Sequence, residues 1–128
     1  MKIDISKISA YLSVFQKAAS PETSYFPDYS PDRYGKLHGH CGCVSYALQK
    51  LIGGRIVSGT IKGQAHFWNE LDNYMYDLCT EQFDTSHFYV CEGKASPIHT
   101  RSRLVPNRKN INPRFQLFWD RVQTTLHQ

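Results

Sequence analysis

The middle of the chain changes its hydrophobic period at the glycine pair Gly53-Gly54. Before the pair, apolar residues between 44 and 51 recur at the three- and four-residue spacing of one helix face. After the pair, polar and apolar residues alternate as they do in strands, over residues 55–62, 65–71 and 74–79. Any fold of this segment must therefore place one helix directly before three consecutive strands.

Helical patterns also predict an element near each end of the chain. Residues 6–19 carry an apolar stripe that stops at Ser20-Pro21, because proline cannot donate the backbone hydrogen bond that would continue a helix. A last helix is expected to begin at Asn112-Pro113, since asparagine is a frequent N-cap and proline is favoured in the first turn.

The remaining stretches have weaker patterns. Residues 21–40 predict a long loop, whose aromatic residues favour a covering that packs against the rest of the domain. Thr80 precedes a short helical turn, and residues 87–91 predict a further strand. The basic segment that follows, residues 94–114, is expected to be irregular up to the last helix.

These elements predict an α+β fold in which the helix that begins at Cys41 packs on a small antiparallel sheet, with helices at both termini. The chain has 128 residues, of which 41% are hydrophobic and 20% charged, as is typical of one globular domain. We expect a single domain over 1–128. It comprises a helix and covering loop (1–40), a helix and strand core (41–92), and a basic loop with the final helix (93–128).

Composition argues against several classes of protein. No apolar stretch is long enough to span a membrane, and residues 1–20 do not resemble a secretory signal, so we expect a cytoplasmic protein without disulfides. The net charge of +4 is concentrated in residues 94–114. This basic segment can be a solvated face or can hold an anionic substrate, a partner or nucleic acid, but no nucleic-acid-binding motif supports the last.

Cys41 lies at the expected start of the central helix, between Gly39 and Gly42. A thiol is a weak nucleophile at neutral pH because little of it is thiolate. The positive end of a helix and a nearby imidazole both favour the anion. Cys43 lies about 200° around the helix from Cys41. Only one of the two can face a site, and we expect Cys43 to face the core.

The strand pairing predicts which residues meet that sulfur. If Asp72-Asn73 forms a two-residue hairpin turn, His66 and Asp77 become diagonal neighbours on one face of adjacent strands. A carboxylate in that position can hold the imidazole in one tautomer and stabilise its protonated form. Cys79 would lie opposite His66 on the same face. The pattern therefore predicts a site with Cys41 as nucleophile and His66 as base.

The chain resembles the small bacterial YunG-like proteins in four stretches: GHCGCVSYALQKLIGGRIVSG, HFWNEL, YDLCTEQF and NPRFQLFWDRVQ. The resemblance covers roughly Gly39 to Gln123, although Cys79 replaces a threonine of the family pattern and residues 86–112 have no clear counterpart. That family in turn resembles the papain-like and transglutaminase-like proteins in its order of helix and strands. The resemblance implies Cys41, His66 and Asp77 as a catalytic triad.

An oxyanion hole would combine the Cys41 backbone N–H with a second donor. His40 is the candidate for that donor, with His38 as an alternative. Trp68 and Asn69 are candidates for shaping the cleft, although core packing explains Trp68 equally well.

Two other interpretations remain open. A zinc site is one of them, because zinc favours nitrogen and sulfur ligands, although the spacing is tighter than in most structural sites. Its candidate ligands would be His38, His40, Cys41, Cys43, His66, Cys79 and Cys91. The other is a non-catalytic binding module whose working surface is the basic segment.

As an enzyme, the chain would transfer an acyl group from an amide, thioester or ester through Cys41. Peptidases, amidases, deamidases and transglutaminase-like enzymes all use this chemistry, on a peptide, a protein or a small amide. No cofactor or nucleotide motif is present, so none is expected. The sequence determines neither the substrate nor the oligomeric state.

Overall fold

The computed structural model describes residues 2–83, 88–93, 96–107 and 111–128 of the chain. The elements are, in chain order, α1 (Ile5–Ala18), α2 (Pro31–Tyr34), α3 (Cys41–Ile52), β1 (Arg55–Ile61), β2 (Gln64–Leu71), β3 (Tyr74–Asp77), the 3₁₀ helix η1 (Glu81–Phe83), β4 (Tyr89–Glu92), β5 (His99–Leu104) and α4 (Pro113–Leu126). The expected α+β fold class is confirmed.

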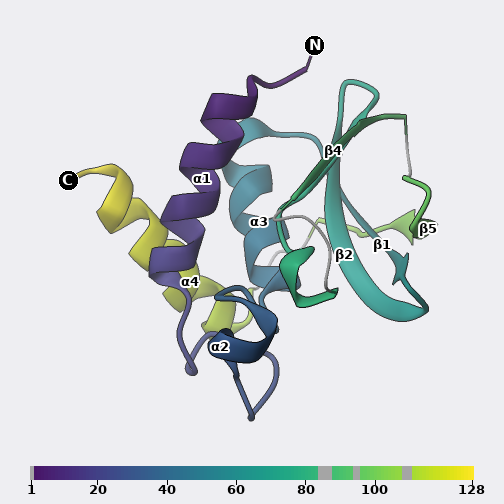
Figure 1. Ribbon diagram of the computed structural model, residues 1–128. Helices are drawn as coiled ribbons and strands as arrows, with labels where there is room; N and C mark the ends of the chain where they lie inside the picture. Colours follow the sequence, from purple (N-terminus) through teal and green to yellow (C-terminus); the bar gives the residue numbers. More distant parts are fainter. Residues whose placement is uncertain (1, 84–87, 94–95, 108–110) are drawn as a thin grey trace.

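The helices lie on one side of the molecule and the sheet on the other (Figure 1). The strands form one antiparallel sheet in the order β4-β3-β2-β1-β5. α3 packs against β1 and β2, α4 packs against α3, and α1 packs against α4. The core between these layers includes the fully buried residues Ile8, Phe15, Leu48, Tyr76 and Phe118. Within the described residues, no helix has the length and apolar character needed to cross a membrane.

Side-chain caps explain where the two terminal helices begin. Asp4 Oδ1 accepts a hydrogen bond of 2.8 Å from the Ser6 backbone N–H at the start of α1. Asn112 Oδ1 accepts a bond of the same length from the Arg114 backbone N–H, with Pro113 in the first turn of α4. Each cap satisfies one of the backbone donors that a helix start leaves without an intrahelical partner. The predicted start of the last helix is therefore confirmed.

Two tight turns set the register of the central strands. The predicted turn at Asp72-Asn73 is confirmed, and both residues have positive φ, at 51° and 64°. The other turn lies at Lys62-Gly63, between Ile61 of β1 and Gln64 of β2, which pair with each other. Two-residue hairpin turns of this kind need positive φ at both central positions, and a glycine at the second adopts it without steric cost.

The expectation of irregular chain between residue 94 and the last helix is wrong, because β5 lies inside that segment. β5 pairs with β1 at one edge of the sheet, with a register irregularity between Ser58 and Gly59. His99 is the one residue of β5 that is buried. Backbone pairing with β1, rather than a buried apolar face, therefore holds this strand, and the sequence shows no alternation of polar and apolar residues there. At the other edge, β4 begins at Tyr89; His87, where the predicted strand started, lies outside the described residues.

The long loop before α3 contains the short helix α2, which the sequence patterns did not predict. Its aromatic rings surround His38, with centroid distances of 5.0 Å for Phe26, 4.7 Å for Tyr34 and 6.3 Å for Tyr29. Ring packing of this kind ties the loop to the segment immediately before Cys41.

The sheet is strongly curved. β4 and β5 are its two edges, yet the His99 ring of β5 contacts the Tyr89 ring of β4, with centroids 5.6 Å apart. Trp68 fills the inside of the curve and is fully buried. A Cβ atom at Gly59 of β1 would collide with the Trp68 ring and with the Thr100 carbonyl oxygen. The absence of a side chain at this position lets β1 and β5 close over the tryptophan.

Candidate functional site

Cys41 is the first residue of α3 and lines a cavity of about 580 Å³. The cavity lies between the start of α3, the start of β2 and the first turn of α4, and His66 lines it too. His40 occupies the N-cap position but makes no side-chain hydrogen bond to the helix. The first backbone N–H groups of α3 thus lack a side-chain cap, and the sulfur of Cys41 lies next to the positive end of the helix.

His66 and Asp77 are in direct contact. His66 Nε2 donates to Asp77 Oδ2 at 2.8 Å, and both side chains are buried. The hairpin register that the sequence predicts is present, since Leu71 pairs with Tyr74 across the turn. Asp77 Oδ1 accepts a bond of 3.0 Å from the backbone N–H of Cys79, just beyond the end of β3. The carboxylate is therefore held on both oxygens.

Burial and charge act in opposite directions on this pair. Burial lowers the pKa of His66, but the Asp77 carboxylate, with a smaller contribution from Cys41, outweighs burial and raises that pKa to about 10. Burial raises the pKa of Asp77, whereas the charge of His66 and hydrogen bonds from His66, His99 and Cys79 lower it to about 2. Each partner favours the charged form of the other, so imidazolium and carboxylate are the stable forms near neutral pH.

The second ring nitrogen of His66 is unused. A carboxylate only accepts hydrogen bonds, so Nε2 must carry the proton that Asp77 receives. Nδ1 is buried and has no hydrogen-bond partner. Cys41 is still near enough to act on the pKa of His66. Hydrogen bonds between catalytic groups are often long until a substrate binds, so this arrangement is compatible with proton exchange between the sulfur and Nδ1.

His99 is a third member of this network, and the sequence patterns did not identify it. Its Nε2 donates to the same oxygen, Asp77 Oδ2, at 2.7 Å. Its Nδ1 lies 2.5 Å from Ser96 Oγ. In the sequence, His99 stands next to a threonine in a basic segment that has no apolar alternation. Such a context does not predict a buried histidine.

The structure places His40 in the core rather than at the cavity. Its Nδ1 lies 2.8 Å from the His38 carbonyl oxygen and its Nε2 lies 2.7 Å from Thr23 Oγ1. Burial lowers the pKa of His40 to about 4. Both ring nitrogens are occupied, so the imidazole stabilises the loop before α3 and has no free N–H for the cavity. The alternative donor, His38, accepts at Nδ1 from the Ser30 backbone N–H at 3.1 Å.

Trp68 and Asn69 lie behind the site. Trp68 packs edge-on against the His99 ring, with centroids 4.9 Å apart, and is fully buried. Asn69 Nδ2 donates to the Ser45 carbonyl oxygen at 2.9 Å, which ties β2 to α3. Asn69 therefore fixes the sheet that carries His66 relative to the helix that carries Cys41.

The other three cysteines have different surroundings from Cys41. Cys43 is buried in the core, as expected, and burial raises its pKa to about 12. Cys79 is also buried, and burial raises its pKa well above the ordinary value. Cys91 is partly buried, and all four thiols are free. In the part of the chain that the structure describes, no group of three or more His, Cys, Asp or Glu side chains is arranged to hold a metal ion.

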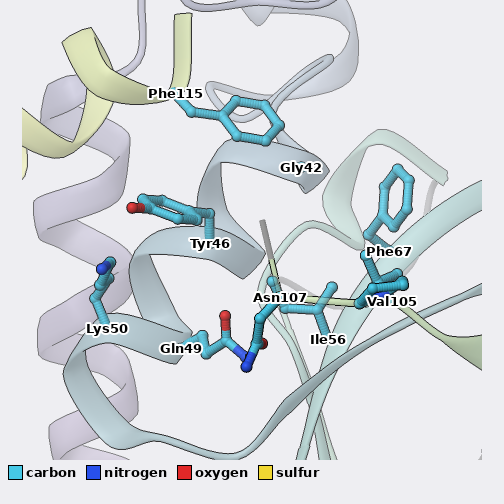
Figure 2. A pocket seen from close by; sticks show the side chains of 10 residues that line it. Gly42, Tyr46, Gln49, Lys50, Ile56, Phe67, Val105, Asn107 and Phe115 are labelled. Atoms are coloured by element: carbon cyan, nitrogen blue, oxygen red, sulfur yellow. The ribbon is translucent and has the colours of Figure 1, made fainter. Parts of the chain in front are cut away.

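A second cavity of about 430 Å³ adjoins the first, and the two share Gly42, Phe67 and Phe115 as lining residues. Figure 2 shows side chains of α3 on one side of this second cavity, and Phe67 and Val105 on the other. Gln49 Nε2 lies 3.4 Å from Asn107 Oδ1 across its lower end. A mostly aromatic and aliphatic hollow with a few polar groups is typical of small-molecule or side-chain binding.

Comparison with known proteins identifies the family. A sequence model described as YunG protein matches residues 7–127. No curated protein and no solved structure matches the chain. The four stretches of resemblance found in the sequence are thus part of a match over nearly the whole chain, and the chain belongs to the YunG protein family.

Proposed function

We propose that this chain is a cysteine-dependent acyl-transfer enzyme, with Cys41 as nucleophile, His66 as base and Asp77 as the carboxylate that orients His66. The arrangement of His66 supports the proposal most strongly. Nε2 of His66 donates to Asp77, whereas Nδ1 is buried and has no hydrogen-bond partner. His66 and Cys41 line the same cavity. This is the arrangement that a general base needs beside a thiol.

The papain-like and transglutaminase-like relationship belongs to the same proposal. Its support is the order of the elements, in which a cysteine-bearing helix is followed by antiparallel strands that supply the histidine and the aspartate. We also propose a cytoplasmic location, because four free thiols fit a reducing compartment.

The reaction would begin from the ion pair in which His66 already holds the proton of Cys41 on Nδ1, as an imidazolium. The thiolate then attacks the carbonyl carbon of an amide, thioester or ester, and its electron pair forms the new C–S bond. As the tetrahedral intermediate collapses, the leaving group departs with the proton from His66. Water or an amine next gives a proton to His66 and attacks the acyl carbon. The C–S bond then breaks, its electron pair leaves on the sulfur of Cys41, and His66 keeps the proton, which restores the ion pair.

The start of α3 supplies candidates for stabilising the tetrahedral oxyanion. The backbone N–H groups of Cys41 and Gly42 lie at a helix start where the N-cap side chain makes no bond. Backbone donors that are already oriented need no reorganisation when charge develops on the oxygen. This assignment replaces the imidazole of His40, whose nitrogens are occupied.

Rates of thiol alkylation test the proposal. Purified protein is treated with iodoacetamide at neutral pH, and peptide mass spectrometry gives a rate constant for each cysteine. We expect Cys41 to react at least about tenfold faster than Cys91, the other partly buried thiol, because an imidazolium and a helix start both favour the thiolate. His66→Ala should reduce the difference, because it removes the imidazolium and leaves the helix start in place. Equal rates for Cys41 and Cys91 in the wild-type protein would contradict an activated nucleophile.

Acyl transfer itself has a separate readout. An activated ester such as p-nitrophenyl acetate should acetylate Cys41, which intact mass spectrometry detects as an adduct. Cys41→Ser and His66→Ala should not accumulate the adduct. A Cys41 that alkylates rapidly but never forms an acyl adduct would favour a binding module with a reactive thiol over an enzyme.

A further inference from the structure

The cavity that holds Cys41 also holds an arginine whose charge has no partner on the cavity wall. Arg114, in the first turn of α4, lines this cavity together with Cys41 and His66. Its Nε is buried and has no hydrogen-bond partner. No Asp or Glu is found among the described residues that line the cavity. The side chain as a whole is partly buried, and a cation whose buried Nε lacks an acceptor favours a negatively charged ligand at this position.

The guanidinium is held in place by its neighbours. Its central carbon lies 5.4 Å from the ring centroids of both Tyr25 and Phe115. Contacts with aromatic faces leave the N–H groups in the guanidinium plane available to an acceptor. The Cys43 thiol is a polar neighbour, but burial raises the pKa of that thiol to about 12, so it stays neutral and does not balance the charge.

Arg114 belongs to the same cavity as the proposed nucleophile rather than to a distant surface. Phe115, the next residue, would touch a Cβ atom built on Gly42 at 3.0 Å, and Gly42 directly follows Cys41. The start of α4 therefore packs against the start of α3 beside the sulfur. A ligand group bound by Arg114 would lie in the space that a substrate of Cys41 must enter.

We infer that Arg114 binds a carboxylate of the substrate, and that Cys41 acts on amides or esters with a free carboxylate near the scissile carbonyl. This inference rests on the proposed function. A planar carboxylate matches the fork of the guanidinium and carries one negative charge. A phosphate carries more charge, yet Arg114 is the one Arg or Lys among the described lining residues. A peptide whose free C-terminus or acidic side chain lies close to the scissile bond has the required chemistry.

Two alkylating reagents of nearly equal size test this inference. Iodoacetate and iodoacetamide react alike, since the thiolate forms a C–S bond and iodide leaves, but only iodoacetate carries a carboxylate. The measured quantity is the ratio of their rate constants at Cys41, divided by the same ratio for free glutathione. Because both reagents need the thiolate, this ratio does not depend on how much thiolate is present. We expect it to favour iodoacetate by about tenfold or more, as one charged hydrogen-bonded contact would give.

Variants of Arg114 locate the origin of the preference. Arg114→Gln should abolish the iodoacetate preference, read from the normalised ratio so that any change in the amount of thiolate cancels, whereas Arg114→Lys should retain part of the preference. Arg103→Gln is the matched control, since it removes the same charge from an exposed position on β5 that does not line the cavity. Arg103→Gln should keep the preference, and an equal loss in both Gln variants would overturn the role of Arg114.

The outcomes separate this inference from the proposed function. If iodoacetamide reacts slowly at Cys41, the activated nucleophile fails. If iodoacetamide reacts rapidly and the normalised ratio for iodoacetate is near one, Cys41 is activated and the carboxylate site is wrong. An iodoacetate preference that survives in a folded Arg114→Gln protein would equally refute the assignment to Arg114.

Discussion

Asp77 is the residue through which the parts of the candidate site are connected. Its Oδ1 accepts from the Cys79 backbone, and its Oδ2 accepts from both His66 and His99. Since the two imidazoles meet the same oxygen, movement of either ring changes the carboxylate that the other contacts. His99 does not line the cavity, so its influence on Cys41 must pass through Asp77 and His66. We therefore expect His99 to act as a positioning residue of the proposed site.

Substitution of His99 tests that role. We expect His99→Phe to slow the iodoacetamide alkylation of Cys41 about fivefold, because it removes one hydrogen bond from Asp77 and leaves an aromatic ring in the buried position. His99→Gln keeps an N–H donor and should retain most of the rate. Downfield proton NMR signals of the imidazole N–H groups provide a structural readout, since His99→Phe should lose one signal and keep that of His66. A folded His99→Phe protein that alkylates at the wild-type rate would refute the positioning role.

At the scale of secondary-structure elements, the first turn of α4 carries Arg114 and Phe115 into the cavity. The Asn112 cap holds that turn. We expect Asn112→Ala to lower the free energy of unfolding by about 1 kcal/mol, measured by urea denaturation. It should also reduce the iodoacetate preference at Cys41, because fraying of this turn loosens the guanidinium.

Asp4→Ala is the control for that prediction. Asp4 caps α1 with the same 2.8 Å geometry, and Asp4 does not line the cavity. Asp4→Ala should cost a similar amount of stability while leaving the iodoacetate preference intact. If both cap variants reduce the preference equally, general destabilisation rather than the position of α4 explains the effect.

The elements also show what the sequence was able to predict. The change of period at Gly53-Gly54 located α3 and the first strands, and hairpin geometry at Asp72-Asn73 placed His66 beside Asp77. Both results depend on local patterns. No sequence pattern predicts β5, because an edge strand with one buried residue has no apolar alternation, and the buried position of His99 is hidden for the same reason. Arg114 meets no Asp or Glu among the described residues that line the cavity, and this depends on how helices distant in sequence pack together. No local sequence pattern reveals such packing.

At the scale of the whole molecule, the site exists only where the two layers meet. The helix layer supplies Cys41 and Arg114, and the sheet supplies His66, Asp77 and His99. The curvature of the sheet brings β5 over to β3, although β2 and β1 lie between them in the strand order. The ionic network at this junction therefore contributes to the stability of the entire fold, which makes stability depend on pH.

The direction of that dependence follows from three buried groups. The pKa of His66 is raised from an ordinary 6.5 to about 10, so its contribution is complete below about pH 6.5 and is lost as the pH rises toward 10. The pKa of His40 is lowered by burial from 6.5 to about 4, so stability falls as the pH drops from 6.5 toward 4. The pKa of Asp77 is lowered from 3.8 to about 2, which adds a further loss below about pH 4. The free energy of unfolding should therefore be greatest near pH 6.5.

Urea denaturation at a series of pH values measures this curve, and two variants divide it into its parts. The loss of stability on the alkaline side should be measured below about pH 8.5. Above that pH the buried thiols, whose ordinary pKa is 9.0, also change the free energy of unfolding. His66→Gln should flatten the curve between pH 6.5 and 8.5 and leave the slope between 4 and 6.5 unchanged. His40→Gln should flatten the curve on the acid side alone. The His40 imidazole of the wild-type protein pairs with Thr23 and the His38 carbonyl and not with Asp77. A wild-type protein whose stability rises from pH 6.5 to 8.5 would show that His66 is not held as an imidazolium, and the proton that the proposed reaction assigns to its ring would have to reside elsewhere.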